Sequence, residues 1–208
     1  MENLPLIGTI VLIHFLALIS PGPDFILAVR NSLAYSRKTG IYTAIGFSLG
    51  IAVHIFYSVL GLALIISKSI LIFNSIKFLG AGYLIYIGIK SFGSKASRIN
   101  VQNEEKKPDI RPIQALKMGF LTNVLNPKAT LLFLSLFTFV IKPDTPAYVL
   151  IAASTIMIID TALWFSLVSI FFTQKRVQNV FDKFQSAFNK IFGGLLIALG
   201  IKIALTDK

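Results

Sequence analysis

The sequence contains no cysteine and comparatively little charge. Without a thiol, the chain can form no disulfide, no thiolate metal site and no thiol redox centre. Charged residues make up only 14% of its 208 residues, whereas apolar residues make up 55% and phenylalanine occurs 18 times. Soluble domains contain fewer apolar and more charged residues. The composition therefore indicates a membrane protein.

Acidic residues are also few, since nine Asp and Glu stand against 20 Lys and Arg, for a formal net charge of +11. Such an excess is typical of proteins that bind nucleic acid, in which basic residues form a continuous patch or stripe. Here the basic residues lie mostly between apolar runs. We interpret them as signals of membrane topology and expect no nucleic-acid partner.

Six apolar runs are long enough to cross a bilayer, whose hydrocarbon core of about 30 Å requires roughly 20 residues of helix. Residues 1–3 contain no Lys or Arg and the first run has no small-residue cleavage site, so we expect a permanent span rather than a signal peptide. Little of the chain remains for a soluble domain. We predict an all-α integral membrane protein, a single transmembrane domain over residues 1–208, with spans at residues 4–29, 41–66, 70–89, 116–141, 147–172 and 188–205.

The basic residues are distributed unevenly between the two faces of this arrangement. The segments that follow the first, third and fifth spans carry fourteen Lys and Arg residues, against five on the opposite face. Because positive residues favour cytoplasmic loops, we expect both termini to lie outside the cytoplasm. The longest polar segment, about residues 91–115, is predicted to be a flexible cytoplasmic loop.

The two halves of the chain resemble each other. Residues 77–90 and 190–202 both read K-x-x-G, then an apolar run, then G-I-K, and proline interruptions and single ionisable residues recur at nearly the same separation. Three crossings in the first half invert the second, so we predict two inverted three-helix repeats, about residues 4–90 and 116–205. Inverted repeats with interrupted helices are typical of secondary transporters, and chance similarity between apolar helices is the alternative.

Prolines interrupt two of the predicted spans. Pro21 and Pro23 flank Gly22 in the first span, and Pro127 follows Asn126 in the fourth. Each proline removes a backbone donor and leaves polar groups that lipid cannot satisfy. We therefore predict that the first and fourth transmembrane helices are broken beside a polar cavity. A proline kink that serves only packing is the alternative.

Three charged residues lie deep within the spans. Asp24 follows the first break, Lys128 follows the second, and Asp160 lies near the centre of the fifth span. Because a charge at that depth costs about 2.5–3.5 kcal/mol, such residues normally pair or line a polar pathway. Asp24 and Lys128 have opposite signs and matched positions. We expect them to face one another, either as a structural ion pair or as ligands for the two charged ends of a zwitterion.

Coupling of transport to protons requires a group that changes its charge during the cycle. Asp160 and its counterpart His54, near the centre of the second span, are the candidates. His14 also lies within a span but has no counterpart in the other half. We interpret His14 as a histidine whose polar atoms are satisfied within the helix packing.

Four motifs carry a resemblance to a known family: S-P-G-P-D-F-I-L-A-V-R-N-S-L from Ser20, G-F-x-x-G from Gly46, G-A-G-Y-L-I-Y-I-G from Gly80 and G-F-L-T-N-V-L-N-P-K-A from Gly119. With them, nearly the whole chain resembles the LysE/RhtB family of amino-acid exporters, and its RhtB-type homoserine and threonine branch in particular. The resemblance implies a multi-pass protein of the bacterial inner membrane that exports amino acids or related small metabolites, driven by proton exchange.

The resemblance and the internal repeat together define a candidate site. The expected partners are an amino-acid substrate, protons and the lipid bilayer, with no cofactor and no metal, and a homo-oligomer is left open. The residues that we predict to bind substrate or to couple its movement to protons are Pro21, Gly22, Pro23, Asp24, His54, Asn123, Asn126, Pro127, Lys128 and Asp160.

The residues argue against three other classes of function. A metal-ion exporter is expected to carry soft or imidazole-rich ligands, but the chain has no cysteine and only two histidines. An intramembrane enzyme needs a nucleophile with a base or a metal cluster, and no such constellation is evident, so we expect no enzymatic activity. A scaffold that transports nothing has no need for central charges beside helix breaks. Export of a different small solute stays open.

Overall fold

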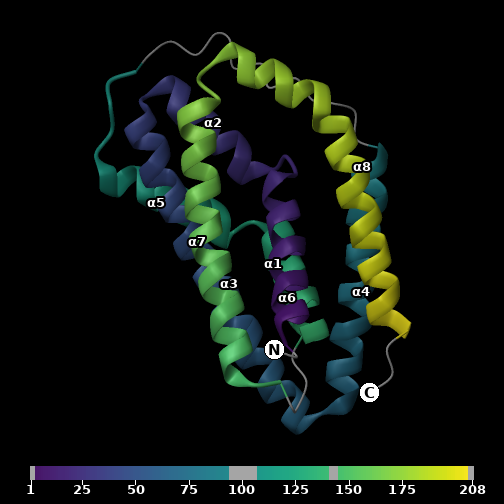
Figure 1. Cartoon of the computed structure of the whole chain (residues 1–208). Coiled ribbons are helices and arrows are strands. Elements are labelled where there is room, and N and C mark those ends of the chain that lie inside the picture. Colours follow the sequence, from purple (N-terminus) through teal and green to yellow (C-terminus); the bar gives the residue numbers. More distant parts are fainter. Residues whose placement is uncertain (1–2, 94–106, 141–144, 206–208) are drawn as a thin grey trace.

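The computed structural model describes residues 3–93, 107–140 and 145–205, and every regular element in these ranges is a helix (Figure 1). The prediction of an all-α chain is confirmed for this part. Most of the predicted loop at 91–115, namely residues 94–106, lies outside the described residues. The helices are α1 (Leu4–Ile19), α2 (Pro23–Ala34), α3 (Arg37–Lys68), α4 (Ile70–Gly93), α5 (Pro112–Val124), α6 (Pro127–Val140), α7 (Ala147–Phe171) and α8 (Lys175–Leu205).

Three of these helices are individually long and apolar enough to cross a membrane: α3 over Arg37–Gly61, α7 and α8. Two helix pairs meet the same criterion together and are bent, α1 with α2 by 54° and α5 with α6 by 58°. If each bent pair is one span, the described residues contain up to five spans. α4, at the predicted third span, contains Lys77 and does not meet the criterion over its described residues. The chain is a multi-pass membrane protein.

α8 begins earlier than we predicted. It starts at Lys175, so residues 175–187, which we predicted to be a loop, are helical. Phe181, Gln185 and Asn189 recur every four residues and are all buried, as expected for one face of a helix. Charged residues lower the mean hydropathy of this segment, and a prediction based on apolar runs therefore misses its helical period.

The helices form two groups with α1 and α6 between them (Figure 1). α3 packs against α5 and α7 in one group, and α4 packs against α8 in the other. α1 contacts both α7 and α8, while α6 contacts both α3 and α4. α1 begins and α8 ends toward the same end of the molecule. This arrangement brings the breaks of the two bent pairs close to each other.

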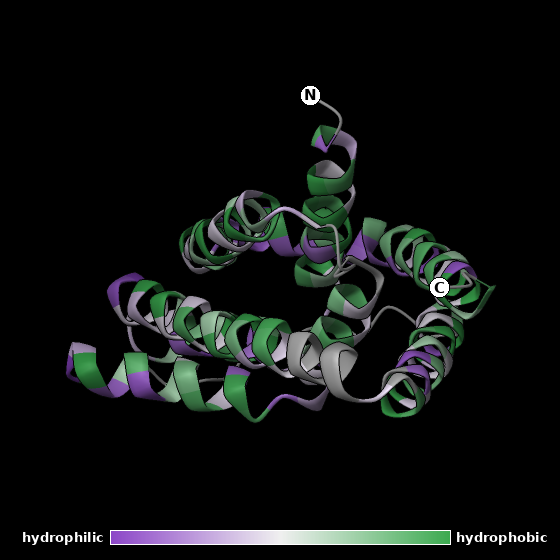
Figure 2. Ribbon diagram, turned by 90° about the horizontal axis from the view of Figure 1, so that it is seen from below, coloured by the Kyte–Doolittle hydropathy of each residue, from purple (hydrophilic) through white to green (hydrophobic). Residues whose placement is uncertain are grey.

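Apolar residues are spread along all the helices in Figure 2, and many of their side chains are exposed on the outside of the molecule. Phe47, Phe133 and Phe137 are completely or almost completely buried, but Leu79 and Ile151 are among many large apolar residues that are more than half exposed. Soluble monomers rarely expose so many large apolar side chains. The outer faces of α4 and α7 are therefore suited to contact lipid.

α3 and α5 approach each other closely at two glycines. A Cβ atom added at Gly119 would lie 2.1 Å from the Thr43 carbonyl oxygen, and one added at Gly46 would lie 2.2 Å from the Leu116 carbonyl oxygen. Both obstacles are backbone atoms, which cannot rotate away as a side chain can. Small residues are the usual means by which membrane helices reach such contact.

We expect Gly119→Ala to lower the thermal stability of the protein, because the new methyl group must push α3 and α5 apart. Overpacking of this kind costs about 1–3 kcal/mol. Gly82→Ala in α4 is the matched control, because a Cβ atom there has no atom within 4 Å of it. Melting of the purified protein in detergent, followed by the fluorescence of its single tryptophan, Trp164, measures the difference. Equal melting temperatures for the two variants would contradict this packing.

The segment before α5 is docked on the start of α3. The hydroxyl of Ser36 donates to Asp109 Oδ2 at 2.7 Å, and the Thr39 hydroxyl donates to Asp109 Oδ1. The backbone N–H of Lys107 donates to the Ala34 carbonyl at 2.7 Å. The hydrogen bonds from Thr39 and then Ser36 hold the pKa of the Asp109 carboxyl below its usual value.

This docking is expected to depend on pH. Because the pKa of Asp109 is lower in the folded than in the unfolded chain, its contribution to stability is present above the unfolded value of about 3.9 and is lost as the pH falls through the folded value. Asp109→Ala should therefore lower the melting temperature slightly near neutral pH and leave it unchanged once the carboxyl is protonated. Asp182→Ala in α8 is the control, and an effect of Asp109→Ala that persists in acid would rule out this origin.

Candidate functional site

The two helix breaks occur at the predicted prolines, and local chemistry explains both. Ser20 and Gly22 are extended, and α2 begins at Pro23, whose missing N–H is unneeded in a first turn. α6 begins at Pro127 in the same way. Its start is capped by Asn126, whose Oδ1 accepts the Lys128 backbone N–H at 3.0 Å. Both breaks are therefore built turns and not frayed helix ends.

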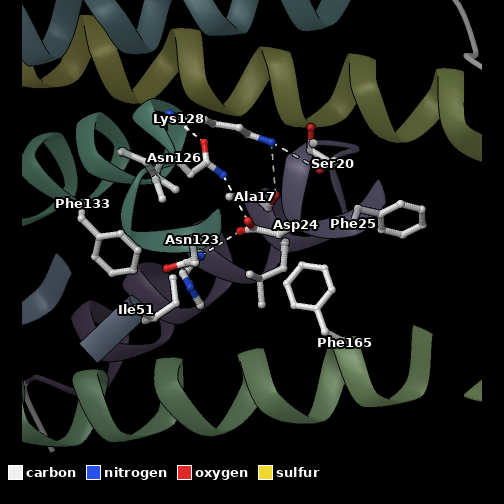
Figure 3. A pocket seen from close by; sticks show the side chains of 15 residues that line it. Ala17, Ser20, Asp24, Phe25, Ile51, Asn123, Asn126, Lys128, Phe133 and Phe165 are labelled. Atoms are coloured by element: carbon white, nitrogen blue, oxygen red, sulfur yellow. Dashed lines mark hydrogen bonds between the residues drawn. The ribbon is translucent and has the colours of Figure 1, made fainter. Parts of the chain in front are cut away.

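The breaks meet around a buried cavity of about 40 Å³ (Figure 3). We call it the central cavity. Its volume holds a few water molecules, since one water needs about 10–15 Å³. Apolar residues such as Phe25, Ile51 and Phe165 form much of the wall. Its polar lining comes from α1, from both breaks and from the first turns of α2 and α6, namely His14, Ser20, Asp24, Asn123, Asn126 and Lys128.

Lys128 reaches from the second break to the first. Because Pro21 has no N–H, the Ala17 carbonyl four residues earlier has no partner within the helix. The Lys128 ammonium donates to this carbonyl at 3.5 Å and to the Ser20 carbonyl at 3.3 Å. It also lies 5.4 Å from the centre of the Phe192 ring. The lysine thus satisfies a carbonyl that the proline of the opposite half leaves free.

Asp24 reaches in the other direction. It lies in the first turn of α2, and its carboxylate accepts from the side-chain amides of Asn123 at 2.8 Å and Asn126 at 3.5 Å. Both amides belong to the second break (Figure 3). The carboxylate also lies near the positive end of the α2 dipole. Each break therefore supplies one charge that is held by polar groups of the other.

Asp24 and Lys128 line the same cavity but do not form a direct ion pair. Among the described residues, no nitrogen–oxygen contact of 4.0 Å or less joins their side chains. Each charge instead has separate partners from the opposite break. Both charged groups are thus arranged around the cavity and leave it between them.

His14 differs from our prediction. Its Nδ1 lies 3.3 Å from both carboxylate oxygens of Asp160 on α7. Its Nε2 is buried and has no hydrogen-bond partner among the described residues, and the side chain lines the central cavity. The interpretation of His14 as a satisfied histidine was wrong. The repeat pattern does not point to His14, because this residue has no counterpart in the other half of the chain. Its partner Asp160 lies 146 residues away in the sequence.

His54 is placed beside the second break and does not line the central cavity. Its Nε2 lies 2.9 Å from the Asn123 carbonyl, which cannot accept from Pro127 and accepts the Asn126 backbone N–H at 2.9 Å as well. A carbonyl only accepts, so Nε2 carries a proton, and Nδ1 accepts from the Tyr57 hydroxyl at 2.5 Å. His54 therefore adds a second hydrogen bond to a carbonyl at the second break.

The ten predicted site residues occupy different positions around the two breaks. Asp24, Asn123, Asn126 and Lys128 surround the central cavity, Asp160 joins it through His14, and His54 supports the second break from behind. Gly22 lines both this cavity and a neighbouring one. Pro21, Pro23 and Pro127 line only the neighbouring cavity. Sequence reasoning missed His14, Ser20 and Ala17, although the carbonyl that Pro21 leaves free four residues earlier is a signal that could have found Ala17.

Comparison with known proteins shows the family of this chain. The family model described as LysE type translocator matches residues 15–207. The membrane protein YrhP of Bacillus subtilis is 35% identical over 197 residues, which cover 90% of this chain and 93% of that protein. The threonine efflux protein of Escherichia coli K12 is 26% identical and covers 95% of this chain and 97% of its own length. No solved structure matches the chain. Because the family model spans most of its length, the chain belongs to the LysE type translocator family.

Proposed function

We propose that this protein is a secondary-active exporter of amino acids in the bacterial inner membrane, with threonine-like and homoserine-like molecules as substrates. The observation that carries the proposal is the crossed arrangement of two broken helices, which places a carboxylate and an ammonium around one buried cavity. The threonine efflux protein among its relatives supports the class of substrate.

A zwitterion has one group for each of the two buried charges. In the proposed complex, the substrate carboxylate binds Lys128 and the substrate ammonium binds Asp24. The substrate then replaces the hydrogen-bond partners that these two residues have in the opposite break. Because neither charge depends on direct contact with the other, both are available to a molecule placed between them. Charge-assisted hydrogen bonds of this kind are about twice as strong as neutral ones.

The central cavity must enlarge for this to happen. Its volume of about 40 Å³ is far below the roughly 300–1,000 Å³ of typical ligand pockets. The bent helices are the natural moving parts, because their breaks are held by side chains and not by continuous helix hydrogen bonds. We therefore propose alternating access, in which the breaks separate on one face of the membrane at a time.

We further propose six spans in two inverted repeats, with α4 as the third span. The bends of 54° and 58°, each at a proline, support a relation between α1–α2 and α5–α6. The helices that the repeat would make equivalent, α3 with α7 and α4 with α8, pack against each other, as helices beside a twofold axis do. With six spans and the distribution of basic residues, both termini lie outside the cytoplasm.

We propose that the exchanged proton binds at Asp160 and His14. Their contact of 3.3 Å joins α7 to α1, and the free Nε2 of His14 belongs to the lining of the central cavity. The other titratable groups of that lining are Asp24 and Lys128. A proton that binds this pair therefore changes the charge next to the substrate site, which is the requirement for coupling.

The test is transport by the purified protein in lipid vesicles with an imposed pH gradient. We expect movement of labelled threonine or homoserine that increases with the gradient and is absent from protein-free vesicles. A panel of other amino acids measures selectivity, and medium from cells that overproduce the protein shows which metabolite leaves the cell. Absence of transport for the whole panel, with and without the gradient, would favour a scaffold over an exporter.

A further inference from the structure

A second and larger cavity lies beside the central one. Its volume is about 520 Å³, within the range of typical ligand pockets. The first turns of α2 and α6 form one side, and α4 and α8 form the other. We call this cavity the vestibule. It shares Ser20, Gly22, Asn126 and Lys128 with the central cavity, so these four residues form the wall between the two.

The vestibule contains a buried polar group without a partner. Gln185 of α8 is only 1% exposed, and its Oε1 has no hydrogen-bond partner among the described residues. An unsatisfied buried acceptor costs about 1–3 kcal/mol. Gln185 lines the vestibule, so a donor bound in the cavity can reach its side chain. A donor such as an ammonium or a hydroxyl fits this acceptor.

The charge of the vestibule has one sign. Lys90 and Lys128 line it, and no acidic residue of the described part of the chain is in its lining. The Lys90 ammonium lies 5.8 Å from the Tyr86 ring at the same cavity. Asp24 near Lys128 lines the central cavity and not the vestibule, so the charged groups that face the vestibule are cations, which attract an anionic group such as the carboxylate of an amino acid. The acceptor of Gln185 then faces the other, donating end of the molecule.

We propose that the vestibule is a separate binding site in which an amino acid is held before it reaches Asp24. This inference rests on the proposed export function. The substrate carboxylate binds between Lys90 and Lys128, and its ammonium or hydroxyl donates to Gln185. Because Lys128 lines both cavities, it can keep hold of the carboxylate while the molecule passes the wall into the central cavity.

The position of the vestibule agrees with the direction of export. Lys90 lies near the end of α4, at the opposite end of the molecule from the start of α1 (Figure 1). With the termini outside, this end faces the cytoplasm. The vestibule is then the site that the substrate meets first.

Thiol labelling tests the site directly, because the chain contains no cysteine of its own. Ser91→Cys places a near-isosteric thiol in the vestibule. Asn179→Cys is the control, because Asn179 is exposed in the first turns of α8, on the face that we expect to be cytoplasmic, and lines neither cavity. A charged thiol reagent is applied to the cytoplasmic face of reconstituted vesicles with and without threonine or homoserine. We expect substrate to slow the modification of Ser91→Cys about tenfold at saturation and to leave that of Asn179→Cys unchanged.

The same experiment in an Asp24→Asn background separates the two sites. Substrate should still protect Ser91→Cys, because the vestibule does not include Asp24. Protection that disappears with Asp24→Asn would assign it to the central cavity and overturn the inference. If the cysteine protein with native Asp24 transports substrate yet is never protected, the vestibule site is refuted while the export function stands. If it transports nothing, the proposed function itself fails.

A second measurement uses Gln185→Leu. Loss of the acceptor should raise the KM for export about tenfold and change the maximal rate less than about twofold, because the acceptor acts only before the central step. Gln174→Leu, at an exposed turn before α8, is the control. A fall in maximal rate with unchanged KM would contradict the vestibule site. The labelling of Ser91→Cys decides the question if Gln185→Leu does not fold.

Discussion

Export by Lys128→Gln is expected to fall about 100-fold below that of the unchanged protein. The Lys128 ammonium is held by two carbonyls of the first break and has no direct ion pair with Asp24, so it can exchange these partners for a substrate carboxylate. Hydrogen bonds to charged groups contribute about 1.5–3 kcal/mol each, and loss of about 3 kcal/mol from the transport barrier corresponds to roughly two orders of magnitude. Threonine release from preloaded vesicles measures the effect.

Two controls show whether this loss is specific. Lys117→Gln removes an exposed lysine from α5 and should leave transport unchanged. Exchange of the two charges, Asp24→Lys together with Lys128→Asp, should not restore export, because each charge has its own partners in the opposite break. A double variant that regains full transport would show that the two residues matter only as a pair and would refute their role as substrate ligands.

Asp160→Asn is expected to uncouple transport from the pH gradient. The variant keeps the size of the side chain but cannot change its charge, so the pair with His14 no longer carries a proton in the proposed way. We expect the acceleration by the gradient to disappear, with a loss of about tenfold or more, while exchange of labelled for unlabelled substrate at equal pH continues. Transport assays with and without the gradient on the same vesicles measure both quantities.

His54→Gln distinguishes the two candidates for coupling that the sequence suggests. His54 does not line the central cavity and donates to the Asn123 carbonyl, so its loss should destabilise the second break and slow transport without removing the response to pH. Asp182→Asn on α8 serves as the control for removal of a carboxylate. A response to the gradient that disappears in His54→Gln and persists in Asp160→Asn would reverse the assignment.

The helix breaks could be predicted from the sequence because proline acts locally. Pro21 and Pro127 lack the N–H that a helix requires, whatever surrounds them. The apolar runs were equally accessible, since burial in lipid follows from composition over about 20 residues. The first half of α8 could not be predicted from the sequence, because residues 175–187 mix charged and buried positions. Only their contacts with other helices show which face of this segment is buried.

The roles of the two intramembrane histidines show the limit of sequence reasoning. The repeat pattern selected His54 and passed over His14, yet His14 is the one that contacts Asp160 and lines the central cavity. A pattern of residue types contains no information on which nitrogen has a partner. The distances of 3.3 Å from His14 to Asp160 and 2.9 Å from His54 to Asn123 supply it.

The sequence by itself determined that this chain is a membrane protein, that prolines interrupt two apolar segments, and that Asp24 and Lys128 follow those interruptions. These features depend on covalent structure and on the transfer of side chains into lipid, which are properties of each residue and its neighbours. Only the tertiary structure decided that each charge is held by the opposite break and that a vestibule lies beside the central cavity. These contacts join residues about 100 positions apart, and their geometry is set by the packing of whole helices.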